Sequence, residues 1–286
     1  MNHTQKGWIN GMLGVLIFSG SLPATRLAVE DLNPVFLTVC RAAIAGIVAI
    51  LLLTGYRQKR PQVQDLLPLI VVSLGVVIGF PLLTALALQQ MTTSHAIIFV
   101  GLLPLATAIF AVIRGGERPH KWFWFFSIIG SLLVGGFAFA QGGHGSWMGN
   151  IYMLLSILVC GLGYAEGAKL SNKLGHWQVI CWALTISLPI MLVLSFWLRP
   201  TNWHDIGYPA WLSLGYVSLF SMLIGFVFWY RGLAQGGIAA VGQLQLLQPF
   251  FGLLLAALLI HEHIGMMLIV VNVAVVGCVM AAKRFA

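Results

Sequence analysis

The chain has 286 residues, of which 59% are hydrophobic and only 8% are charged, and its net charge is +8. A soluble domain carries about 25% charged residues, so this composition excludes an ordinary water-soluble protein. The basic residues are spread over short loops and form no patch, which argues against a nucleic-acid partner. We therefore expect the protein to lie in a lipid bilayer.

Apolar segments long enough to cross a bilayer follow one another along the chain, since a membrane helix needs about 20 apolar residues. Residues 66–113 and 122–165 carry no charge, and each stretch has room for two helices. Single spans fit 7–25, 34–55 (with Arg41 inside it), 174–198, 206–230, 232–261 and 263–282. Because the apolar runs are continuous, they predict helices and not a barrel. We therefore expect an all-α polytopic membrane protein with ten transmembrane helices.

The second half of the chain repeats the first at an offset of 141 to 146 residues. The corresponding positions are Cys40-Arg41 with Cys181-Trp182, Ile78-Gly79-Phe80 with Ile224-Gly225-Phe226, and Pro104 and Glu117 with Pro249 and Glu262. Five spans per copy is an odd number, so the two copies should insert in opposite orientations, as in many secondary transporters. The predicted domains are residues 1–142 and 146–286, joined by a glycine-rich connector.

The lysine and arginine residues predict the orientation. Alternate loops put twelve of them on the side of the termini: Lys6, Arg57, Lys59, Arg60, Arg114, Arg118, Lys121, Lys169, Lys173, Arg231, Lys283 and Arg284. Only Arg26, Arg41 and Arg199 fall on the other side. This bias predicts a multi-pass protein of the cell inner (cytoplasmic) membrane with both termini cytoplasmic. Span 7–25 lacks a signal-peptide cleavage site and completes the first repeat, so we interpret it as a helix that is retained.

A series of short motifs marks the two halves in the same order. They are Asn33-Pro34, Arg41, Leu103-Pro104, Gly116-Glu117-Arg118, Gln248-Pro249, His261-Glu262-His263 and Val276-Gly277-Cys278. In order, spacing and duplication the chain resembles the EamA family of the drug/metabolite transporter (DMT) superfamily, over essentially its whole length. The resemblance implies a ten-helix permease of two inverted five-helix repeats. It also implies export or exchange of small metabolites, amino acids above all. Trp182 departs from the arginine of the first repeat and implies an asymmetric site.

Arg41 is the sharpest candidate for substrate binding. It lies about seven residues into its span, roughly 10 Å along the helix. An intramembrane guanidinium costs at least about 2.5 kcal/mol, so it should face protein or water. Arg41 either holds a substrate carboxylate through two hydrogen bonds or has a structural role, such as snorkelling outward or pairing with Glu30 or Asp31.

Glu166 is the proton-coupling candidate, because it is the only carboxylate well inside a predicted span. Partial burial would let it carry a proton and couple transport to the proton gradient. The other interpretation is a plain helix ion pair with Lys169 at i+3. Glu117 and Glu262 lie at span ends, where each should cap the N–H groups of the following helix.

Polar and aromatic side chains in otherwise apolar spans predict a wet cavity. With Arg41, the substrate-cavity candidates are Thr84, Tyr164, Trp182, Tyr230, Gln245 and Gln248, and Ser19, Ser21, Thr25 and Thr107 are further polar residues of the same kind. Hydroxyl groups often bond their own helix backbone, and the aromatic residues could equally be core. Pro104 and Pro249 should kink their helices, for packing or for gating.

These features favour a secondary transporter that works by alternating access, with one repeat rocking against the other. Spans 1–4 and 6–9 should enclose the cavity, with spans 5 and 10 peripheral. The expected substrate is a small metabolite such as an amino acid, moved outward; protons as a coupling ion, and a monomer or a homodimer, stay open. The first alternative is efflux of drugs or lipid-linked substrates. The other is a non-transporting receptor or intramembrane enzyme, but His261-Glu262-His263 lacks the spacing of a zinc protease, and no catalytic residue, metal site or cofactor is predicted. The four cysteines are expected to be packing residues.

Overall fold

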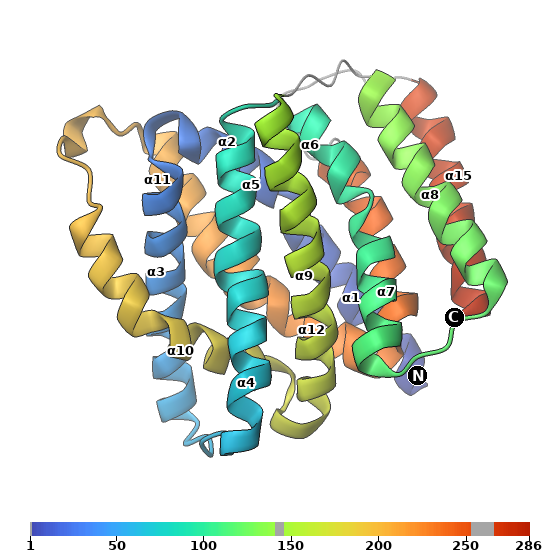
Figure 1. Cartoon of the computed structure of the whole chain (residues 1–286), viewed down its shortest axis with the longest axis horizontal. Coiled ribbons are helices and arrows are strands. Elements are labelled where there is room, and N and C mark those ends of the chain that lie inside the picture. The colour runs from blue at the N-terminus through green and yellow to red at the C-terminus, as the bar shows by residue number, and fades with distance from the viewer. Residues whose placement is uncertain (1, 141–145, 253–265) are drawn as a thin grey trace.

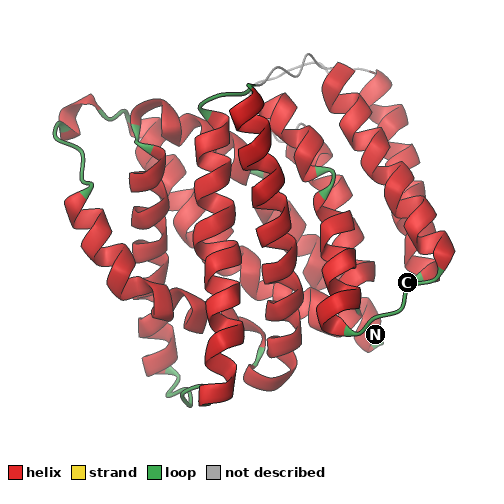
Figure 2. Ribbon diagram, in the orientation of Figure 1, coloured by secondary structure: helices red, strands yellow, loops and turns green. Residues whose placement is uncertain are grey.

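The computed structural model describes residues 2–140, 146–252 and 266–286. These residues are helical almost throughout, and the elements among them include no β-strand (Figure 2). Six helical segments are long and apolar enough to cross a membrane: His3–Asp31, Pro34–Gly55, Val63–Leu88, Trp147–Leu174, His176–Trp197 and Tyr208–Gly236. The all-α, multi-pass membrane fold is thus confirmed, and the count of ten spans stays a prediction.

The first half of the chain supplies nine helical segments among the described residues (Figure 1). They are α1 (His3–Ser19), α2 (Ser21–Asp31), α3 (Pro34–Gly55), α4 (Val63–Val72), the π-helical η1 (Ser73–Gly79), α5 (Phe80–Leu88), α6 (Thr93–Val100), α7 (Leu103–Gly115) and α8 (Lys121–Ala140). Local chemistry starts α3, because the Asn33 side chain accepts from the Val35 N–H and Pro34 occupies the first turn.

The second half follows a similar order. Its elements are α9 (Trp147–Leu174), α10 (His176–Trp197), the 3₁₀ turn η2 (Trp203–Asp205), α11 (Tyr208–Gly215), the π-helical η3 (Tyr216–Ile224), α12 (Gly225–Gly236), α13 (Ile238–Gly242), the 3₁₀ segment η4 (Gln243–Leu247), a helical stretch over 248–252, and α15 (Met266–Phe285). The two π-helical segments lie at corresponding places, since η1 ends at Gly79 and η3 ends just before Gly225.

Two glycine-lined contacts hold helices of different halves together. A Cβ added at Gly232 of α12 would lie 2.6 Å from the Gly11 nitrogen of α1. A Cβ added at Gly75 of η1 would lie 2.6 Å from the Val159 carbonyl oxygen of α9. Only glycine lets backbones approach this closely, as is common between membrane helices. Two close backbone contacts therefore join the halves.

Two other helix pairs also pack against each other. Helix α3 packs against α10, and α8 packs against α15 at one edge of the molecule (Figure 1). The N- and C-termini lie at the same end. Large apolar side chains point outward at Leu51, Leu67 and Leu132. Apolar surface of this extent suits contact with lipid.

Candidate functional site

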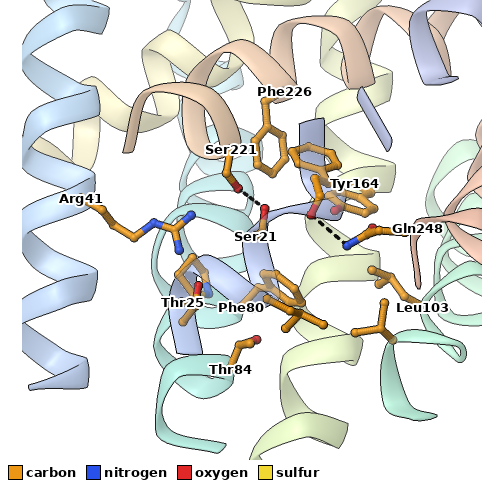
Figure 3. Close-up of a pocket in the computed structure, with 14 residues that line it drawn as sticks. Ser21, Thr25, Arg41, Phe80, Thr84, Leu103, Tyr164, Ser221, Phe226 and Gln248 are labelled. Carbon is orange, nitrogen blue, oxygen red and sulfur yellow. Dashed lines mark hydrogen bonds between the residues drawn. The ribbon is translucent and has the colours of Figure 1, made fainter. Parts of the chain in front are cut away.

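A cavity lies inside the bundle and is lined by helices from both halves (Figure 3). Its polar lining residues are Ser21, Thr25, Arg41, Thr84, Tyr164, Ser221 and Gln248, and its apolar ones are Phe18, Leu22, Phe80, Pro81, Val100, Leu103 and Phe226. The open space is about 30 Å³, room for about two water molecules. The cavity is therefore narrow in this conformation.

Arg41 is the charged side chain of this lining. It is only 6% exposed, and its Nη2 donates to the carbonyl oxygen of Val217 in η3 at 3.1 Å. Its Nε has no hydrogen-bond partner among the described residues. None of the ion pairs found in the described chain includes Arg41, so pairing with Glu30 or Asp31 is not observed. The guanidinium is thus a buried cation that keeps a free donor.

Hydroxyl and amide groups line the same cavity as the guanidinium. The Ser21 hydroxyl of α2 lies 2.7 Å from that of Ser221 in η3. The Gln248 amide donates to the Phe18 carbonyl at 3.2 Å. The Thr84 hydroxyl is buried and unpartnered within the described structure. In Figure 3, Arg41 reaches in from one side and Gln248 lies on the other.

Tyr164 of α9 joins the polar lining to the aromatic wall. Its hydroxyl accepts a hydrogen bond from the Gln245 Nε2 at 3.2 Å, and its ring centroid lies 5.9 Å from that of Phe226. Phe18 and Phe226 meet edge to face at 5.1 Å. The cavity thus offers one cation, several neutral polar groups and an aromatic surface, a combination that suits a small anion with an apolar part.

The predicted cavity residues separate into three groups. Arg41, Thr84, Tyr164 and Gln248 line the cavity. Gln245 lies behind this lining and contacts it through Tyr164. Tyr230 and Trp182 are not among the lining residues: Tyr230 is buried against α9, where its hydroxyl donates to the Gly163 carbonyl at 3.2 Å, and Trp182 is half-buried in α10.

Glu166 does not line the cavity, and its ion-pair partner is not Lys169. Its carboxylate is 2% exposed and accepts a hydrogen bond from the Nε of Arg114, the last arginine of α7. The Arg114 side chain is 49% exposed. The ion pair joins α7 to α9, and it replaces the helix pair with Lys169 that the i+3 spacing suggested.

The prolines and terminal glutamates lie at helix junctions. Pro104 occupies the first turn of α7, directly after the break at residues 101–102, and Pro249 follows the 3₁₀ segment η4. Glu117 accepts from the N–H groups of Ile238 and Ala239 at 2.6 and 2.8 Å. It therefore caps α13 of the other half and not the following helix. Glu262 lies outside the described residues.

Several residues that line the cavity were not predicted from the sequence. Phe18, Phe80 and Phe226 resemble any apolar residue of a membrane helix, and Ser221 is one of several serines that can bond their own helix. Ser21 and Thr25 appeared only as general signs of polarity. No group of three His, Cys, Asp or Glu side chains within the described chain could hold a metal ion.

Comparisons with known proteins found a family model, named transporters and a solved structure that match this chain. The model of the EamA-like transporter family matches residues 5–137 and 147–282. The uncharacterized transporter YdeK of Bacillus subtilis (strain 168) is 70% identical over the full length of both chains. YvbV of the same organism, also named an uncharacterized transporter, is 21% identical over 95% of this chain and 92% of its own. One crystal structure, at 18% identity, covers 98% of this chain and 99% of its own with a TM-score of 0.77, which indicates a shared fold.

Proposed function

Because the chain belongs to the EamA-like transporter family, we propose that it is a secondary transporter of small carboxylate-bearing metabolites such as amino acids. Transport is outward across the cytoplasmic membrane, with both termini in the cytoplasm. The observation that supports this substrate class is Arg41, a buried cation that has no acidic partner within residues 2–140, 146–252 and 266–286 and lies in a cavity lined by both halves. Glu166 is the proposed site of proton coupling.

The electrostatics of the cavity favour an anionic group. A cation taken out of water loses several kcal/mol of hydration unless an opposite charge or several hydrogen bonds replace it. Val217 supplies one acceptor to Arg41, and no carboxylate is found among the described residues that line the cavity. A substrate carboxylate would take the remaining donors, and the unpartnered Thr84 hydroxyl could donate to it. The phenylalanine rings would contact an apolar side chain.

The size of the cavity calls for a conformational change. An open space of about 30 Å³ holds about two waters and no amino acid. The cavity walls must therefore separate to admit substrate, which fits alternating access. Close backbone contacts join α1 to α12 and η1 to α9. We therefore propose that each of these two pairs moves as a unit, and that residues 1–142 do not rock as one body against residues 146–286.

Uptake into proteoliposomes tests this function. Purified protein is supplied with a mixed amino-acid pool, with and without a proton gradient, and compared with Arg41→Lys, Arg41→Gln and Arg199→Gln. Arg199 is an exposed cation in a loop and provides the matched control. We expect Arg41→Gln to lose at least about tenfold in transport efficiency and Arg41→Lys to lose less, since lysine keeps the charge without the paired donors.

Other outcomes would redirect the proposal. Equal uptake by Arg41→Gln and wild type would remove the carboxylate role. A variant that aggregates in detergent would assign Arg41 to folding. If folded wild-type protein takes up no amino acid with or without the proton gradient, amphipathic drugs or lipid-linked solutes become the next substrates to assay. The aromatic wall of the cavity would suit such compounds.

A further inference from the structure

A basic groove opens beside the loop that joins α3 to α4. In Figure 1 this loop lies at the lower left, on the same lower side of the molecule as the two termini at the lower right. The groove has a volume of about 520 Å³, and its lining residues are Arg57, Gln58, Lys59, Arg60, Gln62, Asp65, Lys173 and Leu174. Four of the eight are cations and one is an acid. Lys173 comes from the C-terminal turn of α9, so the groove is built from two distant parts of the chain.

The single acid of the groove is already engaged. Asp65 is buried, and its Oδ1 lies 2.7 Å from the Lys173 Nζ. Its Oδ2 accepts from the Gln62 N–H at 3.2 Å. Asp65 therefore neutralises Lys173 and fixes the base of the groove. The other three cations have no ion-pair partner among the described residues.

The conformation of the loop favours this arrangement of charges. Arg57 has a φ of 49°, a left-handed conformation that usually selects glycine at the end of a helix. Its N–H donates to the Thr54 carbonyl at 3.0 Å and closes α3. The turn thus directs Arg57, Lys59 and Arg60 into the groove, all exposed.

Apolar surface continues from the groove along the membrane-spanning part of α4 and η1. Val63, Leu67, Ile70 and Leu74 are exposed at spacings of four, three and four residues, with Val63 at 84% and Leu67 at 71%. Such spacing forms one stripe down a helix. Next to Arg57 in the chain, the Tyr56 ring meets the Trp177 ring edge to face, with their centroids 5.6 Å apart. Aromatic residues at span ends mark the level of lipid headgroups.

We propose that this groove binds one anionic phospholipid. The phosphate lies among Arg57, Lys59 and Arg60, and an acyl chain follows the apolar stripe of α4. Guanidinium groups pair with phosphate oxygens through parallel hydrogen bonds. Clustered cations just cytoplasmic of a membrane helix attract anionic headgroups. Because cations and apolar stripe adjoin, a lipid suits the groove better than a soluble phosphate, which would use the cations alone.

Lipid titration of the full-length protein tests the site. Detergent-purified protein is titrated with phosphatidylglycerol, with phosphatidylcholine of the same chains, and with inorganic phosphate, and bound lipid is counted by native mass spectrometry beside the melting temperature. The groove variant is Arg57→Gln/Lys59→Gln/Arg60→Gln. The matched control is Lys6→Gln/Lys121→Gln/Arg284→Gln, which removes three exposed cations elsewhere.

We expect wild type and the control to retain phosphatidylglycerol, and the groove variant to lose about a hundredfold in apparent affinity. Arg60→Gln alone should show a smaller loss, and it serves if the triple variant does not fold. Equal retention by the groove variant, or equal binding of phosphatidylcholine, would overturn the proposal. Stabilisation by inorganic phosphate at similar concentration would replace the lipid with a soluble anion. The site is independent of the transport cavity, so its failure leaves the proposed function untouched.

Discussion

The seam between α1 and α12 can be tested by adding one methyl group. At Gly232, a Cβ would lie 2.6 Å from the Gly11 nitrogen, 2.7 Å from the Gly11 Cα and 3.0 Å from the Gly7 carbonyl oxygen. All three atoms are backbone, so no side chain can rotate away. Gly232→Ala must therefore push the two helices apart. Gly136 in α8 is the control, because a Cβ there meets nothing within 4 Å.

The expected magnitude follows from two opposing terms. Overpacking costs about 1–3 kcal/mol, whereas alanine stabilises a helix interior by about 1 kcal/mol relative to glycine. Gly136→Ala receives only the second term. The free energies of unfolding of the two variants should therefore differ by about 2 kcal/mol, with Gly232→Ala the less stable. At about 2–4 °C per kcal/mol, the melting temperatures should differ by about 4–8 °C.

Thermal unfolding in detergent measures this difference through tryptophan fluorescence, since the chain has 10 tryptophans. Equal melting temperatures for Gly232→Ala and Gly136→Ala would refute the close backbone contact. The proposal that α1 and α12 move as one unit would then lose its structural basis. A destabilised Gly232→Ala that still transports would show that the seam serves folding alone.

Two carboxylates give further predictions. Glu117→Gln should lower the free energy of unfolding by about 1 kcal/mol, because the charge and one of the two acceptors at the start of α13 are lost. Glu30→Gln should change the same quantity little, since its contact with Arg26 is exposed and 3.8 Å long; equal losses would contradict the cap. If Glu166 carries protons, Glu166→Gln should lose pH-driven uptake and keep substrate exchange, and an unchanged pH dependence would remove that role. Arg114→Gln should destabilise more than Glu166→Gln, as it leaves a buried charge unpaired.

Composition and continuous apolar runs predict the six membrane-spanning helices that the structure describes, because each span must satisfy its own backbone in lipid. The helix from Pro34 to Gly55 begins at the cap that Asn33 provides, so a neighbouring residue in the sequence determines where it starts. The sequence did not predict the break at Gly20, the break at residues 101–102 or the π-helical segments η1 and η3, because a continuous apolar run looks the same whether or not its helix is interrupted.

The candidate site could be predicted only where chemistry is rare. Arg41 is conspicuous because a charge inside a span is costly. Ser221 is not, because a serine that bonds its own helix looks the same in the sequence as one that faces a cavity. Glu166 shows the limit of local spacing: Lys169 lies three residues away, yet Arg114 from another helix takes the carboxylate.

The asymmetry of the cavity bears on direction of transport. The frame is duplicated, since α3 packs against η3 and α10 packs against η1. Arg41 donates to a carbonyl within η3, while its counterpart Trp182 lies away from the cavity lining. If the halves are inverted copies, as the odd number of predicted spans per half indicates, the states open to the two sides would be equivalent without such a difference. A single cation makes them unequal, so Arg41 would set on which side a carboxylate is held more tightly.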